Sequence, residues 1–85
     1  MKILVIDFEC NQLEVVHLTE EEEQRIVETR KDEEGGFYLE YDTARDILIK
    51  RGFYLTEFNP RWIIEDDDKI PVFDEEHQEE PLLVL

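Results

Sequence analysis

Two carboxylates near the start of the sequence, Asp7 and Glu9, have a spacing that could support metal chemistry. They follow the apolar run at residues 3–6, which is rich in β-branched side chains and predicts a strand. Residues two apart on a strand point to the same face, so both carboxylates could bind one divalent cation for phosphoryl transfer. An ordinary amphipathic strand with acids on its solvent-facing side would show the same pattern without binding a metal or catalysing a reaction.

The segment 3–10, Ile-Leu-Val-Ile-Asp-Phe-Glu-Cys, resembles the first motif of the DEDD family of 3′→5′ exonucleases, in which an apolar strand ends in Asp-x-Glu. The resemblance implies that Asp7 and Glu9 bind catalytic Mg²⁺. It ends at Cys10, where the family often has a threonine. The family's further acids come from distant helices of a larger domain, and no family-like context surrounds the acids that could be nominated here. We therefore expect no catalytic residue and a protein that is not an enzyme.

The rest of the sequence offers few residues for catalysis or for a cofactor. Serine is absent, and the single Cys10 excludes a disulfide framework and a zinc site built from cysteines. His17 and His77 each lack a second histidine four residues further on. The acidic run at residues 65–68 lacks the glycine and the spaced ligands of an EF-hand loop, so it predicts weak counterion binding only. We expect no metal site and no cofactor.

The net charge is the strongest compositional feature of the chain. Its 85 residues contain 24 Asp or Glu and 9 Lys or Arg, for a formal net charge of −15. This balance excludes direct nucleic-acid binding and binding to an anionic membrane, because both need an excess of Lys and Arg. The sequence contains neither an apolar run of about 18 residues nor a signal-peptide pattern. We expect a cytoplasmic protein, in the host cytoplasm if a phage encodes it.

The negative charge is concentrated in two segments. Residues 20–36 contain eight acids and three bases, and residues 62–85 contain nine acids and one base. Residues 37–61 between them are neutral, with four acids and four bases, and contain six of the nine aromatic side chains. We therefore expect the middle segment to supply the core and the other two segments to form acidic surface.

The first acidic segment is predicted to be a helix that follows two strands. The second strand spans residues 13–18, after a short polar turn. Thr19 and Glu22 have the spacing of a capping box, so the helix should begin at Glu20 and run to about Glu33, where two glycines end it. Its apolar side is thin, which predicts a surface helix docked along one edge.

The rest of the chain is predicted as a series of short elements. These are an extended segment at 37–41, a helix at 44–51 capped by Asp42 or Thr43 and ended by Gly52, a strand at 53–58, a turn at Asn59-Pro60, and strands at 62–65 and 70–73 around the turn 66–69. Pro71 restricts the last strand to an edge. The apolar end at residues 82–85 should pair with the sheet or with another chain. We predict a small α+β fold with an antiparallel-dominated sheet of four to five strands and two helices. Residues 1–73 form the single domain, and residues 74–85 form an acidic segment with a strand-like apolar tag.

The excess of acid exceeds what solubility requires, since a charge of about 2–8 in magnitude suffices for a small domain. Two acidic segments on one face could resemble the phosphate array of a duplex. We therefore expect a DNA-mimic inhibitor that blocks the basic surface of a nuclease or another nucleic-acid-binding protein. In size and charge it is similar to anti-restriction, anti-CRISPR and nuclease-immunity proteins. The predicted partner-binding residues are Glu20, Glu21, Glu22, Glu23, Glu28, Glu65, Asp66, Asp67, Asp68, Asp74, Glu75 and Glu76.

The alternative is a non-catalytic structural or assembly module. In that case residues 82–84 would pair two copies into a homodimer, and the acidity would serve only solubility. The two hypotheses differ in one structural respect. A binding surface requires the two acidic segments to lie together, whereas solvation does not.

Overall fold

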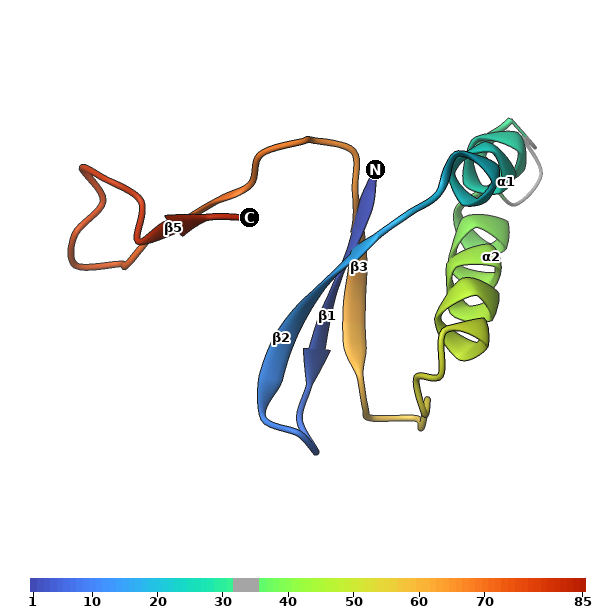
Figure 1. Cartoon of the computed structure of the whole chain (residues 1–85), viewed down its shortest axis with the longest axis horizontal. Coiled ribbons are helices and arrows are strands. Elements are labelled where there is room, and N and C mark those ends of the chain that lie inside the picture. The colour runs from blue at the N-terminus through green and yellow to red at the C-terminus, as the bar shows by residue number, and fades with distance from the viewer. Residues whose placement is uncertain (32–35) are drawn as a thin grey trace.

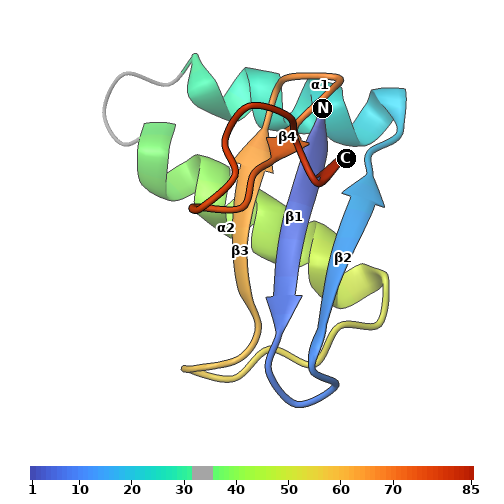
Figure 2. The same ribbon diagram turned by 90° about the vertical axis from the view of Figure 1, so that its left-hand side faces the viewer.

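The structure, a computed structural model, describes residues 1–31 and 36–85 and has an α+β fold. Two helices cover one face of a three-stranded antiparallel sheet, and a two-stranded sheet near the C-terminus lies on the other side (Figures 1 and 2). The elements are β1 (Lys2–Asp7), β2 (Gln12–His17), α1 (Glu20–Arg30), α2 (Gly36–Lys50), β3 (Arg61–Glu65), β4 (Pro71–Val72) and β5 (Leu83–Val84). The predicted fold class is confirmed, with five strands divided between two sheets.

Strand β1 is the central strand, since the sheet order is β2-β1-β3 and both pairings are antiparallel. The register aligns Ile3 with Val16 and with Ile64, and these side chains belong to the face that packs on the helices. Because side chains alternate along a strand, the neighbouring Leu4 and Ile6 point to the opposite face. The same strand therefore supplies apolar side chains to both faces of the sheet.

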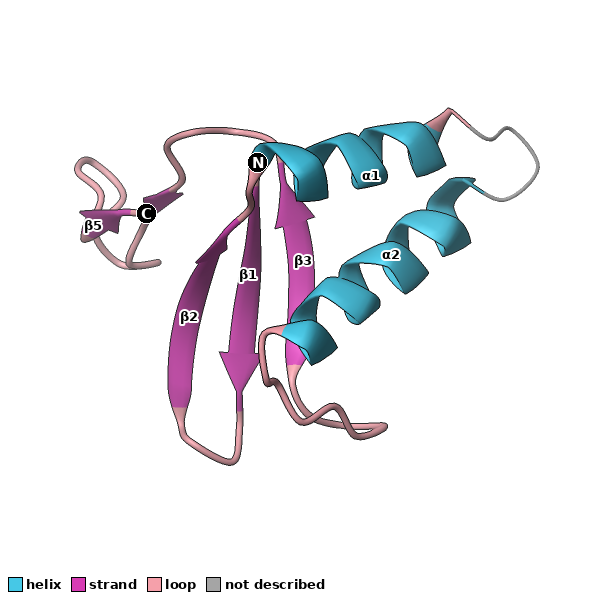
Figure 3. Ribbon diagram, turned by 45° about the vertical axis from the view of Figure 1, so that its right-hand side comes forward, coloured by secondary structure: helices cyan, strands magenta, loops and turns pink. Residues whose placement is uncertain are grey.

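The core lies between the sheet and the helices (Figure 3). Its buried members are Ile3, Val5, Val16, Ala44 and Leu48. Half-buried side chains of the loop after α2 and of strand β3 close around this cluster. Full burial of a Val, Leu or Ile side chain is worth about 1.5–3 kcal/mol, so this layer carries most of the stability of a small domain.

Helix α1 begins where the sequence predicts. The Thr19 hydroxyl accepts a hydrogen bond from the Glu22 amide at 3.2 Å, and the Glu22 carboxylate accepts one from the Thr19 amide at 2.9 Å. The capping box is thus confirmed. The helix ends at Arg30, earlier than predicted, and the glycine pair expected to end it falls partly in residues 32–35, outside the described residues.

Residues 37–41 are helical, so the prediction of an extended segment there is wrong, as is the predicted start of the second helix at residue 44. The aromatic content of this segment favours a strand locally. However, Tyr41, Ala44 and Leu48 follow a helical spacing of three and four residues, which puts them on one face. Tyr41 stacks on Trp62 with ring centroids 4.9 Å apart, and Ala44 and Leu48 are buried. Packing on the sheet therefore outweighs local propensity.

The predicted strand at residues 53–58 is also wrong, because this segment is a loop that closes the core. Gly52 has a φ of +95°, so the left-handed residue after α2 is confirmed. The backbone then bonds locally, from the Phe53 amide to the Leu48 carbonyl at 3.0 Å and from the Thr56 amide to the Asn59 carbonyl at 2.6 Å. These bonds satisfy the backbone without a neighbouring strand.

The C-terminal residues form a small hairpin of their own. Strands β3 and β4 lie where two short strands are predicted, but β4 pairs with β5 instead of β3. Two further backbone hydrogen bonds join Ile70 and Leu85, at 2.8 and 3.1 Å. The apolar end at residues 82–85 thus pairs within its own chain. Residues 70–85 are called the C-terminal hairpin below, and they lie over the upper part of the sheet face that the helices leave open (Figure 2).

Candidate functional site

Asp7 and Glu9 do not form a carboxylate pair on one strand. Strand β1 ends at Asp7, and Glu9 lies in the turn that follows. The Asp7 Oδ1 atom accepts hydrogen bonds from the Glu9 amide at 3.0 Å, the Cys10 amide at 3.1 Å and the Asn59 side chain at 3.1 Å. These bonds, above all that from the Cys10 amide, lower the pKa of Asp7. The arrangement suits an acid that shapes the turn.

The described residues contain no cluster of three or more potential metal ligands. His17 is exposed at the end of edge strand β2, and His77 is exposed in the turn of the C-terminal hairpin.

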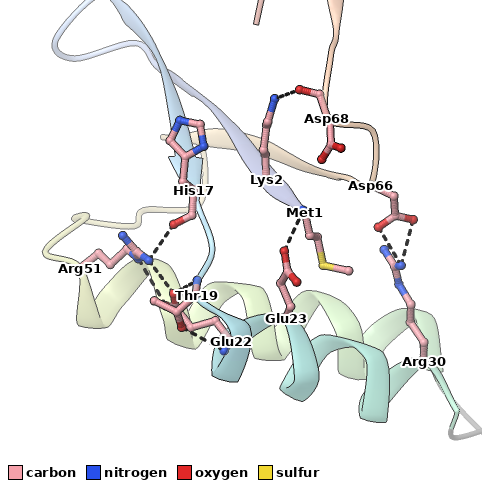
Figure 4. A network of polar contacts seen from close by, with 10 residues as sticks. All are labelled: Met1, Lys2, His17, Thr19, Glu22, Glu23, Arg30, Arg51, Asp66 and Asp68. Carbon is pink, nitrogen blue, oxygen red and sulfur yellow. Dashed lines mark hydrogen bonds and ion pairs between the residues drawn. The ribbon is translucent and has the colours of Figure 1, made fainter.

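Two of the predicted partner-binding acids on α1 are engaged within the fold. The Glu22 carboxylate pairs with the Arg51 guanidinium at 2.5 Å, and the same Arg51 nitrogen donates to the His17 carbonyl at 2.9 Å (Figure 4). The hydrogen bond from Arg51 is the main cause of the lowered pKa of Glu22. Glu23 pairs with the amino group of Met1 at 2.8 Å. These contacts fix α1 against the end of the sheet.

The other three predicted acids on α1 point away from the core. At 3.6 residues per turn, Glu20, Glu21 and Glu28 lie on the side of the helix opposite the buried Ile26. All three are exposed, and none makes an ion pair within the described part of the chain. Glu28 lines a shallow hollow of about 320 Å³ between α1 and α2. These carboxylates are available to a partner.

Arg30 connects helix α1 to the second acidic segment. Its guanidinium pairs with Glu40 of α2 at 2.5 Å and with both carboxylate oxygens of Asp66 at 2.9 and 3.0 Å (Figure 4). The contacts with Glu40 and Asp66 raise the pKa of Arg30, Glu40 being the larger cause. One cation thus brings the end of α1 beside the turn that follows β3, although Asp66 is 36 residues further along the chain.

The turn after β3 is also held from its other side. The Lys2 side chain is buried, and its Nζ donates to the Asp68 carbonyl and, at 3.1 Å, to the Leu85 carbonyl. The carboxylates of Asp67 and Asp68 make no ion pair among the described residues, and both side chains are exposed. Glu65, at the end of β3, is half-buried and faces Lys2 in the register of the sheet. The side chains of Lys2 and Arg30 therefore hold the turn in position, and the carboxylates of Asp67 and Asp68 stay exposed.

The predicted acids of the C-terminal hairpin lie in its connecting segment. The Asp74 carboxylate accepts a hydrogen bond from the Glu76 amide at 2.8 Å, and Asp74 forms an isolated β-bridge with His77. Glu75 and Glu76 are exposed. This arrangement shows a turn closed by local hydrogen bonds.

The acidic segments follow one another along the molecule, with Lys69 and the apolar residues Ile70, Val72 and Phe73 between the last two. Helix α1, the turn 65–68 and the connection 74–80 follow one another along the longest dimension, which is 41 Å (Figure 1). We call these residues the acidic edge. The turn 65–68 is fixed to α1 by Arg30 and to β1 by Lys2. The turn 65–68 therefore lies beside the end of α1, whereas the connection 74–80 lies at the far end of the molecule from α1 (Figure 1).

Sequence reasoning missed a second feature, an apolar groove on the open face of the sheet. Its floor is formed by Leu4, Ile6, Leu13 and Ile63, and the C-terminal hairpin supplies a wall through Ile70, Val72 and Leu85. Arg61 and Trp62 of β3 complete the lining. The groove has a volume of about 390 Å³. A signal was present in the sequence, because four consecutive apolar residues at 3–6 are typical of a strand with two apolar faces.

The chain matches no protein family, no curated protein and no solved structure. Among the described residues, no helix is long and apolar enough to cross a membrane.

Proposed function

We propose that this protein is an acidic inhibitor, a DNA mimic that binds the basic nucleic-acid-binding surface of a partner protein and blocks it. The observation that carries the proposal is the Arg30–Asp66 contact, since it brings an acidic turn of the second segment beside the end of the acidic helix α1. If the acidity served only solubility, nothing would require acids so distant in sequence to lie together.

The density of charge along the acidic edge supports this proposal. Duplex DNA carries about one phosphate charge per 1.7 Å of axis, or about 24 charges over 41 Å, the longest dimension of this protein. The residues of the acidic edge contain 14 acids and two bases, for a formal net charge of −12, which is of the same order. Such a surface attracts a Lys/Arg groove from a distance and accelerates association at low salt.

Affinity chromatography on the immobilised protein tests the proposal. A bacterial lysate is applied at low salt and eluted with a salt gradient, and each eluted protein is assayed for duplex binding. We expect at least one nucleic-acid-binding protein that loses DNA binding as this protein is added, and that duplex DNA displaces from the column. The proposal is overturned if every eluted protein keeps its full DNA binding in an excess of this protein.

Two triple variants with the same net charge separate the acidic edge from general acidity. The edge variant is Glu20→Gln/Glu21→Gln/Glu28→Gln. We expect it to associate with the captured partner about tenfold more slowly, because electrostatic steering changes association rates by tenfold or more.

The control variant, Glu9→Gln/Asp42→Asn/Glu57→Gln, removes three exposed carboxylates from other elements. It should retain most of the inhibition. If the two variants lost inhibition equally, inhibition would depend only on the net charge of the protein. That result would contradict a specific acidic edge.

The open sheet face supports a second function, a homodimeric assembly module. Leu13 is 51% exposed and Ile63 49% exposed on this face, and both could be covered by a second copy. Salt separates the two functions. Association of two chains of charge −15 should strengthen as salt screens their repulsion, whereas binding to a basic partner should weaken.

A further inference from the structure

The apolar groove of about 390 Å³ combines an apolar lining with acidic segments next to it. Three of its floor side chains, Ile6, Leu13 and Ile63, remain about half exposed, at 47%, 51% and 49%. A concave apolar site of this volume is within the usual range for ligand sites, about 300–1,000 Å³. The fold therefore leaves an apolar surface that only another molecule would cover.

The groove is bounded by elements that are tied to one another. The Lys2 Nζ atom donates to the Asp68 carbonyl and to the Leu85 carbonyl, so it fixes both ends of the C-terminal hairpin to strand β1. Leu85 and Ile70 also exchange backbone hydrogen bonds. The wall of the groove is thus held in position without an occupant.

The charge around the groove selects its occupant. The one charged side chain in the lining of the groove is Arg61, at the start of β3. The segments that lead into the hairpin and across its turn contain nine acids between residues 65 and 80, with Lys69 as the only base. An occupant that leaves the groove over the hairpin is therefore favoured if it is apolar inside the groove and positively charged beyond it. A second copy meets this requirement poorly, since it would bring its own acidic segments and a net charge of −15 against the same acids.

We propose that the groove takes an apolar segment of the basic partner, flanked by Lys or Arg residues. This inference deepens the proposed function and rests on it. The acidic edge then accounts for fast association, and the groove provides the desolvated contact that slows dissociation. One apolar anchor beside steering charges is a common arrangement in tight protein complexes.

Binding of short peptides to the full-length protein tests the groove directly. The probe is acetyl-KRLFLRK-amide, and acetyl-KRSGSRK-amide carries the same charges without the apolar centre. At about 0.15 M salt, where the Debye length is about 8 Å, we expect the apolar peptide to bind about tenfold more tightly. It should shift the amide resonances of Leu4, Ile6 and Ile63. Equal affinities for the two peptides, or shifts confined to α1, would overturn the proposal.

Paired substitutions separate the groove from other exposed apolar residues. Ile6→Thr on the groove floor and Ile49→Thr on the outer side of α2 change residues of similar exposure, 47% and 51%. Ile6→Thr should weaken binding of acetyl-KRLFLRK-amide about tenfold, and Ile49→Thr should leave it unchanged. Equal effects would contradict a specific site. If Ile6→Thr does not fold, the affinities of the wild-type protein for acetyl-KRLFLRK-amide and acetyl-KRSGSRK-amide still test whether the groove binds the apolar segment.

Two further results decide between occupants. Tight binding of the acid-flanked peptide acetyl-EELFLEE-amide would contradict charge selection. Shifts of the groove resonances that depend on protein concentration, without any peptide, would assign the groove to a second copy. Failure of the proposed function is distinguishable, because it appears as unaltered DNA binding by the captured proteins, whatever the peptides do.

Discussion

The two faces of strand β1 carry similar side chains but differ in what covers them. Ile3 and Val5 are fully buried beneath the helices, whereas Ile6, from the same strand, is 47% exposed on the open face. The covered face forms the core with α2 and the loop after it. The open face is bounded only by the C-terminal hairpin, which consists of two two-residue strands.

The covered face of the sheet therefore serves folding stability, and the open face is the one that could bind another molecule. A hydrophobic side chain contributes to folding in proportion to the area that it buries, so the covered face supplies most of the folding energy. The open face keeps apolar area that folding has not used. Exposed apolar surface beside a charged rim is typical of an interaction site.

The largest expected effect comes from alanine substitution at two isoleucines of β1. Ile3→Ala creates a cavity in the core and should lower the free energy of unfolding by about 2–5 kcal/mol. Ile6→Ala should cost about 1 kcal/mol or less, because its side chain is already half solvated. Urea unfolding of both variants measures the difference. The shared loss of β propensity cancels between them.

Equal destabilisation by Ile3→Ala and Ile6→Ala would remove the distinction between the faces. It would mean that the hairpin covers Ile6 in solution, and that the groove is part of the core. A small effect of Ile3→Ala together with a large effect of Ile6→Ala would reverse the assignment of the core.

A smaller effect is expected where the hairpin is attached to the open face. Lys2→Met keeps the aliphatic stem but removes the donor to the Asp68 and Leu85 carbonyls. Hydrogen bonds from a charged group are worth about 1.5–3 kcal/mol. Lys2→Met should therefore raise the equilibrium constant for opening of the C-terminal hairpin by the factor that corresponds to this free energy. Hydrogen exchange of the Ile70 and Leu85 amides measures this opening.

The amides of the covered side serve as the internal reference for Lys2→Met. Exchange at Ile3 and Leu48 should change much less than exchange at Ile70. Lys50→Met, at an exposed position on α2, is the matched control and should leave the hairpin amides unchanged. Uniformly faster exchange in Lys2→Met would show that the hairpin and the helical layer unfold as one unit.

The sequence predicted the parts of the fold that local chemistry determines. The capping box at Thr19, the left-handed Gly52 and the α+β class are all confirmed. The errors at residues 37–41 and 53–58 have one cause. Aromatic residues favour strands locally, but Tyr41 and Phe53 pack on the sheet from a helix and a loop, and Tyr38, Tyr54 and Phe58 stay exposed.

The candidate site was predictable only in part. The runs of acidic residues can be recognised directly in the sequence. The Arg30–Asp66 salt bridge cannot, because it links residues 36 positions apart in the chain. The structural use of Glu22 and Glu23 was equally hidden, since their partners Arg51 and Met1 are close only after folding. Glu20, Glu21 and Glu28 remain on the outer side of α1, as a partner-binding role requires.

The smallest expected effect concerns the charge pair that closes the covered side. The folded state lowers the pKa of Glu22 below its ordinary value of 4.5, mainly through the hydrogen bond from Arg51. The unfolded state therefore binds a proton more readily, and stability from this pair is present above pH 4.5 and is lost as pH falls through the folded pKa. Glu22→Gln keeps the capping geometry but loses the charge, so it should cost about 1 kcal/mol or less at neutral pH.

That cost should vanish on acidification, because both proteins then carry a neutral side chain at residue 22. Urea midpoints between about pH 7 and pH 3 measure the convergence. Glu75→Gln, on the open side, removes a carboxylate that has no ion pair in the described chain, so its difference from wild type should not follow the titration of Glu22. The comparison between variants is needed because protonation also relieves the repulsion of the −15 charge, which acts on every variant alike. A difference for Glu22→Gln that stays constant with pH would show that Arg51 holds α1 through the His17 carbonyl alone.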